Sequence, residues 1–195
     1  MGKIFCLMGK SSSGKDTLYK KLKERYPQLR TVVPYTTRPI RENEKDGVEY
    51  YFVGNETYRE MERKGRVIEA RSYDTKCGVW TYFTADDGQI DLLCYDYLVI
   101  GTLVSCQALK EYFGEESIVP VYIETEDGMR LARALERERA QSHRKYAEMC
   151  RRFLADEEDF SEENLRKAGI TKRFENVELE KCMEEIGVYI EDLGV

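Results

Sequence analysis

The sequence predicts an α/β fold with a central, mainly parallel sheet and helices on both faces. Short apolar runs of strand length recur along the chain, at 3–8, 97–100 and 118–123. Segments with helical spacing of apolar residues lie between such runs, as over 103–113. Apolar residues make up 42% of the chain, which is enough for a buried core. Strands that are apolar throughout and alternate with helices are typical of a parallel sheet covered on both sides.

The N-terminal third is predicted to begin with a strand, a helix and a second strand. Residues 3–8 (KIFCLM) are an apolar run that ends at a glycine, which fits a buried strand followed by a turn. Over 16–26, Leu18 and Leu22 are four residues apart with lysines between them, as in an amphipathic helix. A short strand is expected at 31–33.

The middle of the chain is predicted to interrupt the alternation of strands and helices and then to resume it. Residues 36–53 lack a helical period and end in an aromatic run, so we expect a loop with small antiparallel strands. The elements expected next are a helix at 57–64, strands at 67–70, 79–84 and 97–100, a helix at 103–113 and a strand at 118–123.

The C-terminal third is predicted to be mostly helical. From about 127 to 154 the pattern is helical and basic, and it leads into the acidic segment DEEDF at 156–160. A last strand is expected at 170–174 and a last helix at 178–189.

Composition limits the possible partners. The 195 residues include 31 Lys and Arg against 37 Asp and Glu, a net charge of −6. This length fits one domain with a small inserted lid. The net acidity argues against nucleic acids and anionic membranes as partners. No apolar run approaches the roughly 20 residues that cross a bilayer, and no signal peptide precedes the first strand, so we expect a cytoplasmic protein.

The cysteines are interpreted as reduced thiols. They are scattered, without a C-x-x-C pair, whereas a small disulfide-rich domain would be denser in cysteine. The six are Cys6, Cys77, Cys94, Cys106, Cys150 and Cys182. The only histidine, His143, argues against a zinc site and is interpreted as an exposed lid residue.

Residues 9–17 (GKSSSGKDT) have the G-x-x-x-x-G-K spacing of a P-loop. Glycines let successive backbone N–H groups turn toward one phosphate, and the following helix adds the positive end of its dipole. Lys15 would reach the outer phosphates. A Ser/Gly-rich turn is the alternative, but the flanking strand and helix favour the P-loop. The loop predicts ATP contacts at Gly9, Lys10, Ser11, Ser12, Ser13, Gly14, Lys15, Asp16 and Thr17.

Asp16 stands where P-loops ordinarily carry Ser or Thr, whose hydroxyl binds Mg²⁺. A bound Mg²⁺ would offset the repulsion between this carboxylate and the phosphates. Thr17 lies about 100° further round the helix and is a poor substitute. We predict that Asp16 contacts the metal directly or through water. The alternative is a carboxylate that only accepts hydrogen bonds from backbone N–H groups at the helix start.

A second candidate anion site follows the P-loop. Arg38 and Arg41, with Tyr50 downstream, can converge on a monophosphate, because arginine offers a bidentate fork and tyrosine a hydroxyl donor. The alternative is a solvated basic loop. Residues 36–53 resemble the T-T-R-x-x-R-x-x-E-x-x-G-x-x-Y-x-F segment of guanylate kinases. A weaker resemblance to that family extends over nearly the whole chain.

The resemblance implies a P-loop NTPase fold with a small mixed acceptor-binding subdomain and a helical lid. It implies transfer of the γ-phosphoryl group of ATP to GMP or dGMP, aided by Mg²⁺. Arg38, Arg41 and Tyr50 would bind the acceptor phosphate, Glu69 the guanine and Asn176 the ATP. Glu69 could instead be a strand residue that faces water. The implied single domain has a core (1–33, 85–126 and 156–195), an acceptor-binding region (34–84) and a lid (about 127–155).

Several family positions differ in this chain. Pro34 replaces a serine that helps to read the guanine carbonyl. Cys77-Gly78-Val79 replaces Y-G-S, whose tyrosine binds phosphate and whose serine reads the base, and Trp80 or Tyr82 are candidates to substitute. The family's D-x-D falls on Ile100-Gly101-Thr102, which lacks carboxylates. The phosphate-binding half is therefore intact, whereas the guanine-reading half is reduced to Glu69.

Two alternative functions follow from these differences. The chain also resembles ribose 1,5-bisphosphate phosphokinases, in its G-K-D P-loop and in Gly101-Thr102, although that family lacks the run from Arg41 to Tyr50. The other alternative is a non-catalytic guanylate kinase-like interaction module. Such modules typically lose the lysine and arginines that survive here as Lys15, Arg38 and Arg41, which favours an enzyme.

The lid is predicted to carry catalytic arginines. Arg130, Arg133 and Arg137 are three and four residues apart on one helical face, opposite Leu131 and Leu135. The resemblance implies that Arg133, Arg137 and Arg152, with Lys15 and Arg38, stabilise charge on the transferred phosphoryl group. The alternative is a solvated helix whose arginines pair with Glu136 and Glu138.

The charge is segregated along the chain. Residues 1–50 hold 11 basic and 6 acidic residues, and 129–155 hold 8 and 3, whereas 156–195 hold 5 and 13. The basic segments would attract small anionic nucleotides, ATP and GMP, and we expect the acidic C-terminal segment to lie outside the site.

Overall fold

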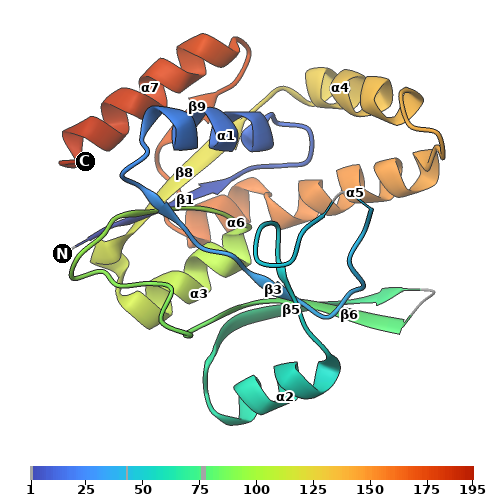
Figure 1. Ribbon diagram of the computed structural model, residues 1–195. Helices are drawn as coiled ribbons and strands as arrows, with labels where there is room; N and C mark the ends of the chain where they lie inside the picture. Colours follow the sequence, from blue (N-terminus) through green and yellow to red (C-terminus); the bar gives the residue numbers. More distant parts are fainter. Residues whose placement is uncertain (1, 43, 76–77) are drawn as a thin grey trace.

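The computed structural model describes residues 2–42, 44–75 and 78–195. Its larger sheet has the strand order β2-β7-β1-β8-β9, and its strand pairs are parallel (Figure 1). The strands are β1 (Ile4–Met8), β2 (Arg30–Thr31), β7 (Tyr97–Ile100), β8 (Ile118–Glu124) and β9 (Arg173–Glu175). The predicted α/β class is confirmed.

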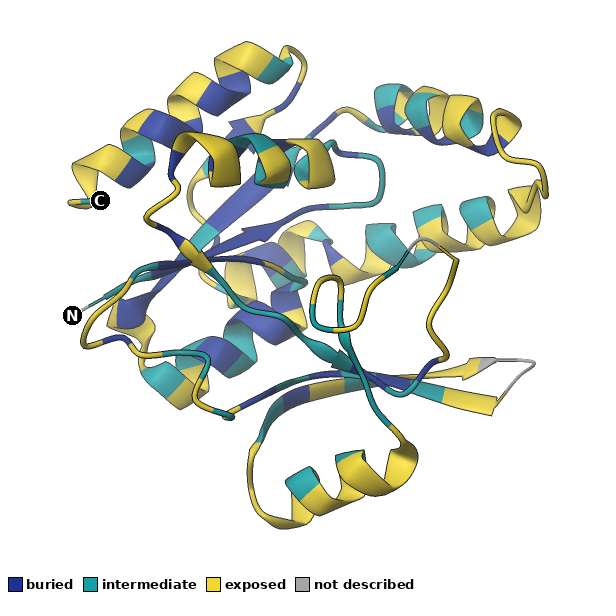
Figure 2. Ribbon diagram, viewed as in Figure 1, coloured by how far each residue is buried: buried dark blue, intermediate teal, exposed yellow. Residues whose placement is uncertain are grey.

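Helices cover both faces of this sheet, because the side chains of β1 alternate between two apolar clusters. Phe5 and Leu7 pack in the cluster that includes residues of α1 (Lys15–Arg25) and α7 (Leu179–Asp192). Cys6 packs on the other face with residues of α3 (Leu103–Phe113) and α6 (Glu162–Lys167). Figure 2 shows the resulting band of buried residues along the centre of the sheet. A short 3₁₀ helix (Glu115–Ser117) precedes β8.

A second, mixed sheet has the order β4-β3-β6-β5. Its strands are β3 (Tyr35–Thr36), β4 (Tyr51–Phe52), β5 (Val67–Thr75) and β6 (Gly78–Ala85), and α2 (Asn55–Arg63) follows β4. β3 pairs antiparallel with β6 but parallel with β4. The expected antiparallel arrangement is therefore wrong for β3 and β4, because the long loop between them returns the chain to the same end of the sheet.

Two helices project beside both sheets, α4 (Asp127–Arg139) and α5 (Tyr146–Asp159) (Figure 1). They match the predicted helical stretch over 127–154, with a break between them. α5 continues through the acidic residues up to Asp159. None of the described helices is long and apolar enough to cross a membrane.

Candidate functional site

The loop between β1 and α1 is tightly curled. Ser12 has a φ of 63° and Gly14 a φ of 88°, both in the left-handed region. A Cβ on Gly14 would lie 2.3 Å from Nδ2 of Asn176, and a Cβ on Gly9 would lie 2.6 Å from the carbonyl oxygen of Ile123. Glycine is therefore required at both positions, because the close approach of the chain leaves no room for a side chain.

Two side chains that follow the carboxyl ends of β8 and β9 hold this loop in place. Asn176 donates from Nδ2 to the carbonyl oxygen of Ser13 at 2.7 Å, and the Thr125 hydroxyl donates to the same oxygen at 3.1 Å. Asn176 itself is buried. The loop is therefore preorganised by the core sheet, and the predicted contact of Asn176 with ATP stays a prediction.

Four buried polar atoms around the loop have no hydrogen-bond partner among the described residues. They are Ser12 Oγ, Ser13 Oγ, Arg133 Nη1 and Asn176 Oδ1. Buried polar groups are nearly always paired, and an unpaired one costs about 1–3 kcal/mol. Three of the four can donate a hydrogen bond. The loop is therefore suited to a ligand that presents several oxygen acceptors, as a phosphate does.

The first turn of α1 presents the residues expected to meet that ligand. The Lys15 side chain is half-buried and makes no hydrogen bond or ion pair with any described residue. Asp16 and Thr17 are exposed, and α1 has no side-chain cap at its N-terminus. Among the described residues, no hydrogen bond ties the Asp16 carboxylate to backbone N–H groups, so the capping alternative has no support there.

The outer part of the loop contacts α5. Lys10 Nζ donates to both carboxylate oxygens of Glu157 at 2.8 Å, and the Ser11 N–H donates to Asp156 Oδ2 at 2.7 Å. Burial alone would raise the pKa of Glu157, but hydrogen bonds from Lys10 and Arg130 lower it. The expectation that the acidic C-terminal segment lies outside the site is therefore wrong for these two carboxylates.

Arg130 joins α4 to the same part of the loop. Its side chain is 1% exposed, and Nε donates to the carbonyl oxygen of Ser11 at 3.1 Å. Nη1 donates to Asp127 at 2.5 Å and to Glu157 at 2.8 Å. The helix thus docks on the loop through its basic face and leaves Leu131 exposed. Arg130 is a structural brace, a role that sequence reasoning did not find.

The remaining lid residues lie at different depths. Arg133 Nη2 donates to the carbonyl oxygen of Asn176 at 3.2 Å, beside the P-loop. Arg137 and Arg152 are exposed, and Arg152 lies 3.9 Å from Glu148. The structure therefore brings Arg133 to the loop and leaves Arg137 and Arg152 at the surface of α4 and α5. His143 is exposed, as expected.

Arg38 lies just after the end of β3, in the second sheet. It is buried, and its Nη1 and Nη2 donate to the Glu44 carboxylate at 2.7 and 2.6 Å. Its guanidinium carbon lies 5.2 Å from the ring centres of Tyr50 and Phe52. The Arg38 hydrogen bonds lower the pKa of Glu44 to about 2. Arg41 is exposed and is bonded to Glu44 through its backbone, whose N–H donates to the Glu44 carboxylate and whose carbonyl oxygen accepts from the Glu44 N–H.

Tyr50 belongs to an aromatic cluster beside Arg38. Its ring centre lies 5.6 Å from that of Tyr82, edge to face. The hydrogen bonds to Glu44 raise the pKa of Arg38, and the nearby Tyr82 adds to this effect. Tyr82 therefore lies at this site, whereas Trp80 pairs with Tyr73 further along the β5–β6 hairpin. Of the replaced family positions, Cys77 lies outside the described residues and Val79 is exposed.

Glu69 is buried in β5, so the alternative that it faces water is wrong. Its carboxylate accepts hydrogen bonds from Thr84 Oγ1 at 3.0 Å and from Arg71 Nε at 3.1 Å. Sequence reasoning did not find Arg71. Thr102, in place of the second family carboxylate, accepts from the Ser105 N–H and caps α3.

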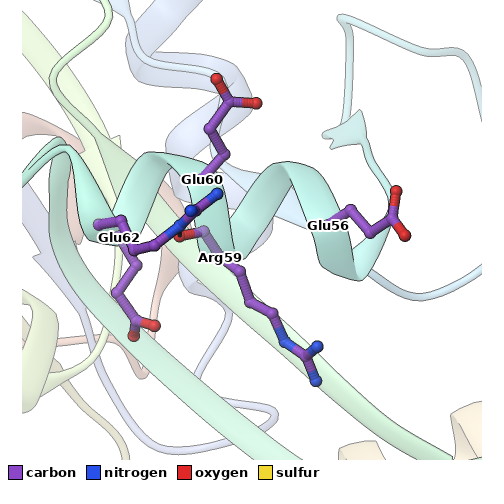
Figure 3. A pocket seen from close by; sticks show the side chains of 5 residues that line it. Glu56, Arg59, Glu60 and Glu62 are labelled. Carbon is purple, nitrogen blue, oxygen red and sulfur yellow. Dashed lines mark hydrogen bonds between the residues drawn. The ribbon is translucent and has the colours of Figure 1, made fainter.

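A shallow surface hollow lies elsewhere, on α2 (Figure 3). It is lined by Glu56, Arg59, Glu60, Glu62 and Arg63, which all come from this one helix. None of the residues of α2 is buried. Figure 1 shows α2 on the far side of the second sheet from α1. We therefore do not assign the hollow to the functional site.

A parallel sheet whose first strand leads into a tightly curled loop with P-loop spacing, beside a second sheet with a buried arginine, is the arrangement of an α/β protein with a P-loop. The sequence model of the guanylate kinase family matches residues 1–79. The first 79 residues thus relate the chain to the guanylate kinase family.

Individual relatives are similar to part of this chain. The guanylate kinase of Thermosynechococcus vestitus is 41% identical over 68 residues, which are 35% of this chain and 36% of the relative. That of Frankia casuarinae is 44% identical over 63 residues, 32% and 34% of the two chains. The chain therefore matches about a third of the length of these curated relatives.

A solved structure extends the likeness of fold to nearly the whole chain. The guanylate kinase from Anaplasma phagocytophilum superimposes with a TM-score of 0.67 at 20% identity, over 98% of this chain and 85% of that one. At this identity the match shows the fold alone. It confirms the predicted fold with its parallel sheet and second, mixed sheet.

Proposed function

We propose that this protein is a guanylate kinase, which transfers the γ-phosphoryl group of ATP to GMP and releases GDP and ADP. The observation that carries the proposal is the preorganised P-loop with its unpaired donors, Ser12 Oγ, Ser13 Oγ and Arg133 Nη1. These donors would be satisfied by phosphate oxygens. The family model that matches residues 1–79 and the names of the relatives support guanine nucleotides as the acceptor class.

On the ATP side, the loop N–H groups and Lys15 would hold the β- and γ-phosphates. Asp16 is exposed at the mouth of the loop, which suits a carboxylate that holds Mg²⁺ together with phosphate oxygens. When bound, Mg²⁺ would neutralise charge that develops on the phosphates. Arg133 would add a positive charge at the same place without reorganisation, because it already lies beside the loop.

On the acceptor side, Arg38 would bind the acceptor phosphate with help from Arg41 and Tyr50. Arg38 is buried and fixed by Glu44, so little side-chain entropy is lost when a phosphate binds. Its Nε is buried without a partner, which leaves one donor for a ligand. The role of these residues is positioning, because phosphoryl transfer depends mainly on alignment and charge neutralisation.

The lid, about 127–155, would complete the site. Arg137 and Arg152 are exposed on α4 and α5, so their catalytic roles require these helices to move toward the bound nucleotides. Such closure would also exclude water. We place the activity in the cytoplasm, a location that the free thiols of the five described cysteines support.

The test is ADP release from ATP with GMP, dGMP, AMP, UMP and ribose 1,5-bisphosphate as separate acceptors. We expect GMP to be turned over fastest, and faster turnover of another acceptor would overturn the proposal. Lys15→Ala should lower turnover by roughly 100-fold or more with an unchanged circular dichroism spectrum. Lys20→Ala, an exposed lysine on the same helix, is the matched control and should retain activity.

A further inference from the structure

Glu69 and Arg71 lie on the same face of β5, because alternate residues of a strand point the same way. The pairing of β5 with β6 shifts between Val67 and Glu69, where an irregularity interrupts the ladder. Such bulges re-aim the side chains that follow them. After the shift, Glu69 is opposite Thr84 and Arg71 is opposite Tyr82.

Arg71 covers the Glu69 carboxylate. Arg71 donates from Nε to Oε2 at 3.1 Å and from Nη2 to Oε1 at 3.4 Å, and Thr84 donates to Oε1 at 3.0 Å. The Glu69 side chain is 3% exposed, whereas that of Arg71 is 27% exposed. A ligand that enters from solvent therefore meets the guanidinium before it meets the carboxylate.

Arg71 also lies between the two halves of the site. Its Nη1 is 3.5 Å from Oγ1 of Thr102, which begins α3 directly after β7. β7 is the neighbour of β1, the strand that leads into the P-loop. On the other side, Arg71 pairs with Tyr82, whose ring packs against Tyr50. The guanidinium thus occupies the space between the acceptor-phosphate residues and the core sheet.

We propose that Arg71 is the specificity-determining residue that contacts the acceptor base, and that Glu69 is a positioning residue that orients Arg71. This inference rests on the proposed function, a kinase for a guanine nucleotide. An arginine fork matches two adjacent acceptors, and guanine offers that pattern at O6 and N7. The base would then be read by its acceptor edge.

The proposal has a consequence for the 2-amino group of guanine. A carboxylate would accept hydrogen bonds from N1–H and this amino group, but the Glu69 oxygens already accept three. With Arg71 as the contact, the 2-amino group is not read. IMP, which lacks that group but keeps O6 and N7, would bind as GMP does. AMP would be rejected, because its 6-amino group is a donor that faces the cation.

The experiment measures the binding of GMP, IMP and AMP to the full chain by calorimetry, without ATP. We expect the Kd values of GMP and IMP to agree within about threefold, and AMP to bind at least about tenfold more weakly. Arg71→Ala should raise the Kd values of GMP and IMP alike, by roughly 10- to 100-fold, which corresponds to the loss of a hydrogen bond to a charged group. Arg59→Ala, an exposed arginine on α2, is the matched control and should change neither Kd.

The ratio of the AMP Kd to the GMP Kd separates a base contact from a structural role, because Arg71→Ala should lower this ratio only if Arg71 itself contacts O6 and N7. Glu69→Gln should weaken the binding of GMP and of IMP equally, because it only removes a contact that orients Arg71. Arg71→Lys, which keeps the charge but not the fork, should give intermediate affinities, and it serves where Arg71→Ala does not fold.

Three results would overturn the inference: GMP that binds more than tenfold tighter than IMP, unchanged or tighter binding of GMP by Arg71→Ala, or no binding of either nucleotide. Binding of both without ADP release would instead contradict the proposed kinase activity and leave the inference standing.

Discussion

Asp16 is the residue at which the P-loop differs most clearly from the usual pattern. Its carboxylate is exposed at the first turn of α1, where a metal held by phosphates would meet it. We expect Asp16→Ala to raise the Mg²⁺ concentration needed for half-maximal turnover, because one charged ligand is lost. Lys20→Ala, an exposed residue further along the same helix, is the control. Identical Mg²⁺ titrations of the wild type and Asp16→Ala would contradict this role.

The pairing of Arg38 with Glu44 gives the protein a pH-dependent stability. The pKa of Glu44 is about 2 in the folded chain, below its ordinary value of 4.5. The pair therefore stabilises the fold fully above pH 4.5, and this contribution is lost as the pH falls toward 2. We expect the free energy of unfolding of Glu44→Gln to fall less over this range than that of the wild type.

Urea titrations at several pH values between 2 and 6 would measure this effect. Arg38 keeps its charge throughout, so the change can be assigned to the carboxylate. Glu49→Gln, an exposed glutamate in the same loop, is the control. If the free energies of unfolding of the wild type and Glu44→Gln fall by the same amount over this pH range, the proposed role of Glu44 is wrong.

Local spacing predicted some site residues, and tertiary contacts determined others. Lys15 and Arg38 belong to motifs whose chemistry depends on neighbours in sequence, so the sequence alone is enough to propose them. Arg71, Arg130 and Asp156 act through partners on other elements. Sequence spacing does not show which strand or helix those side chains will meet, so their roles required the structure.

At the scale of single elements, the best predictions were those with clear end signals. α3 spans the residues expected, since Thr102 and Ser105 form a capping box and Gly114 follows its last residue. β5 and β6 are longer than expected, because their polar ends pair with each other and not with the core. α6 was not expected, because its six residues are too few to show a helical period.

The contact of α4 with the P-loop can be tested through Arg130. Arg130→Met would leave the carboxylates of Asp127 and Glu157 without this cation, and we expect a loss of about 2–4 kcal/mol in the free energy of unfolding. Urea denaturation would measure the loss. Arg139→Met, an exposed arginine at the end of the same helix, should change it by less than about 0.5 kcal/mol. Equal effects of the two substitutions would contradict a bracing role.

At the scale of the whole molecule, burial differs between the two sheets (Figure 2). All five residues of β1 are buried, whereas both residues of β4, one of the two residues of β3 and most of β6 are half-buried or exposed, and α2 has no buried residue. Regions with few buried apolar contacts open at a lower free energy than the core. The acceptor side should therefore be the more easily opened part of the fold.

Native-state hydrogen exchange would test this difference. We expect the amides of β1 and β8 to exchange slowest, near the rate of global unfolding, and those of α2 and β4 to exchange much faster. Added GMP should slow exchange in β3 and β4 more than in β1, because it binds the acceptor side. Uniform protection across both sheets would show that the molecule opens only as one unit.

The anchoring of α5 has a mechanical consequence. Its C-terminal end is tied to the P-loop through Asp156 and Glu157, while Tyr146 begins the helix about 16 Å from these anchors, at 1.5 Å per residue. The helix can therefore act as a lever that pivots where it contacts the P-loop. A tilt of about 10° at this contact moves the far end of the helix by about 3 Å over this length. Small displacements at Lys10 and Ser11 would therefore be enlarged at the turn between α4 and α5.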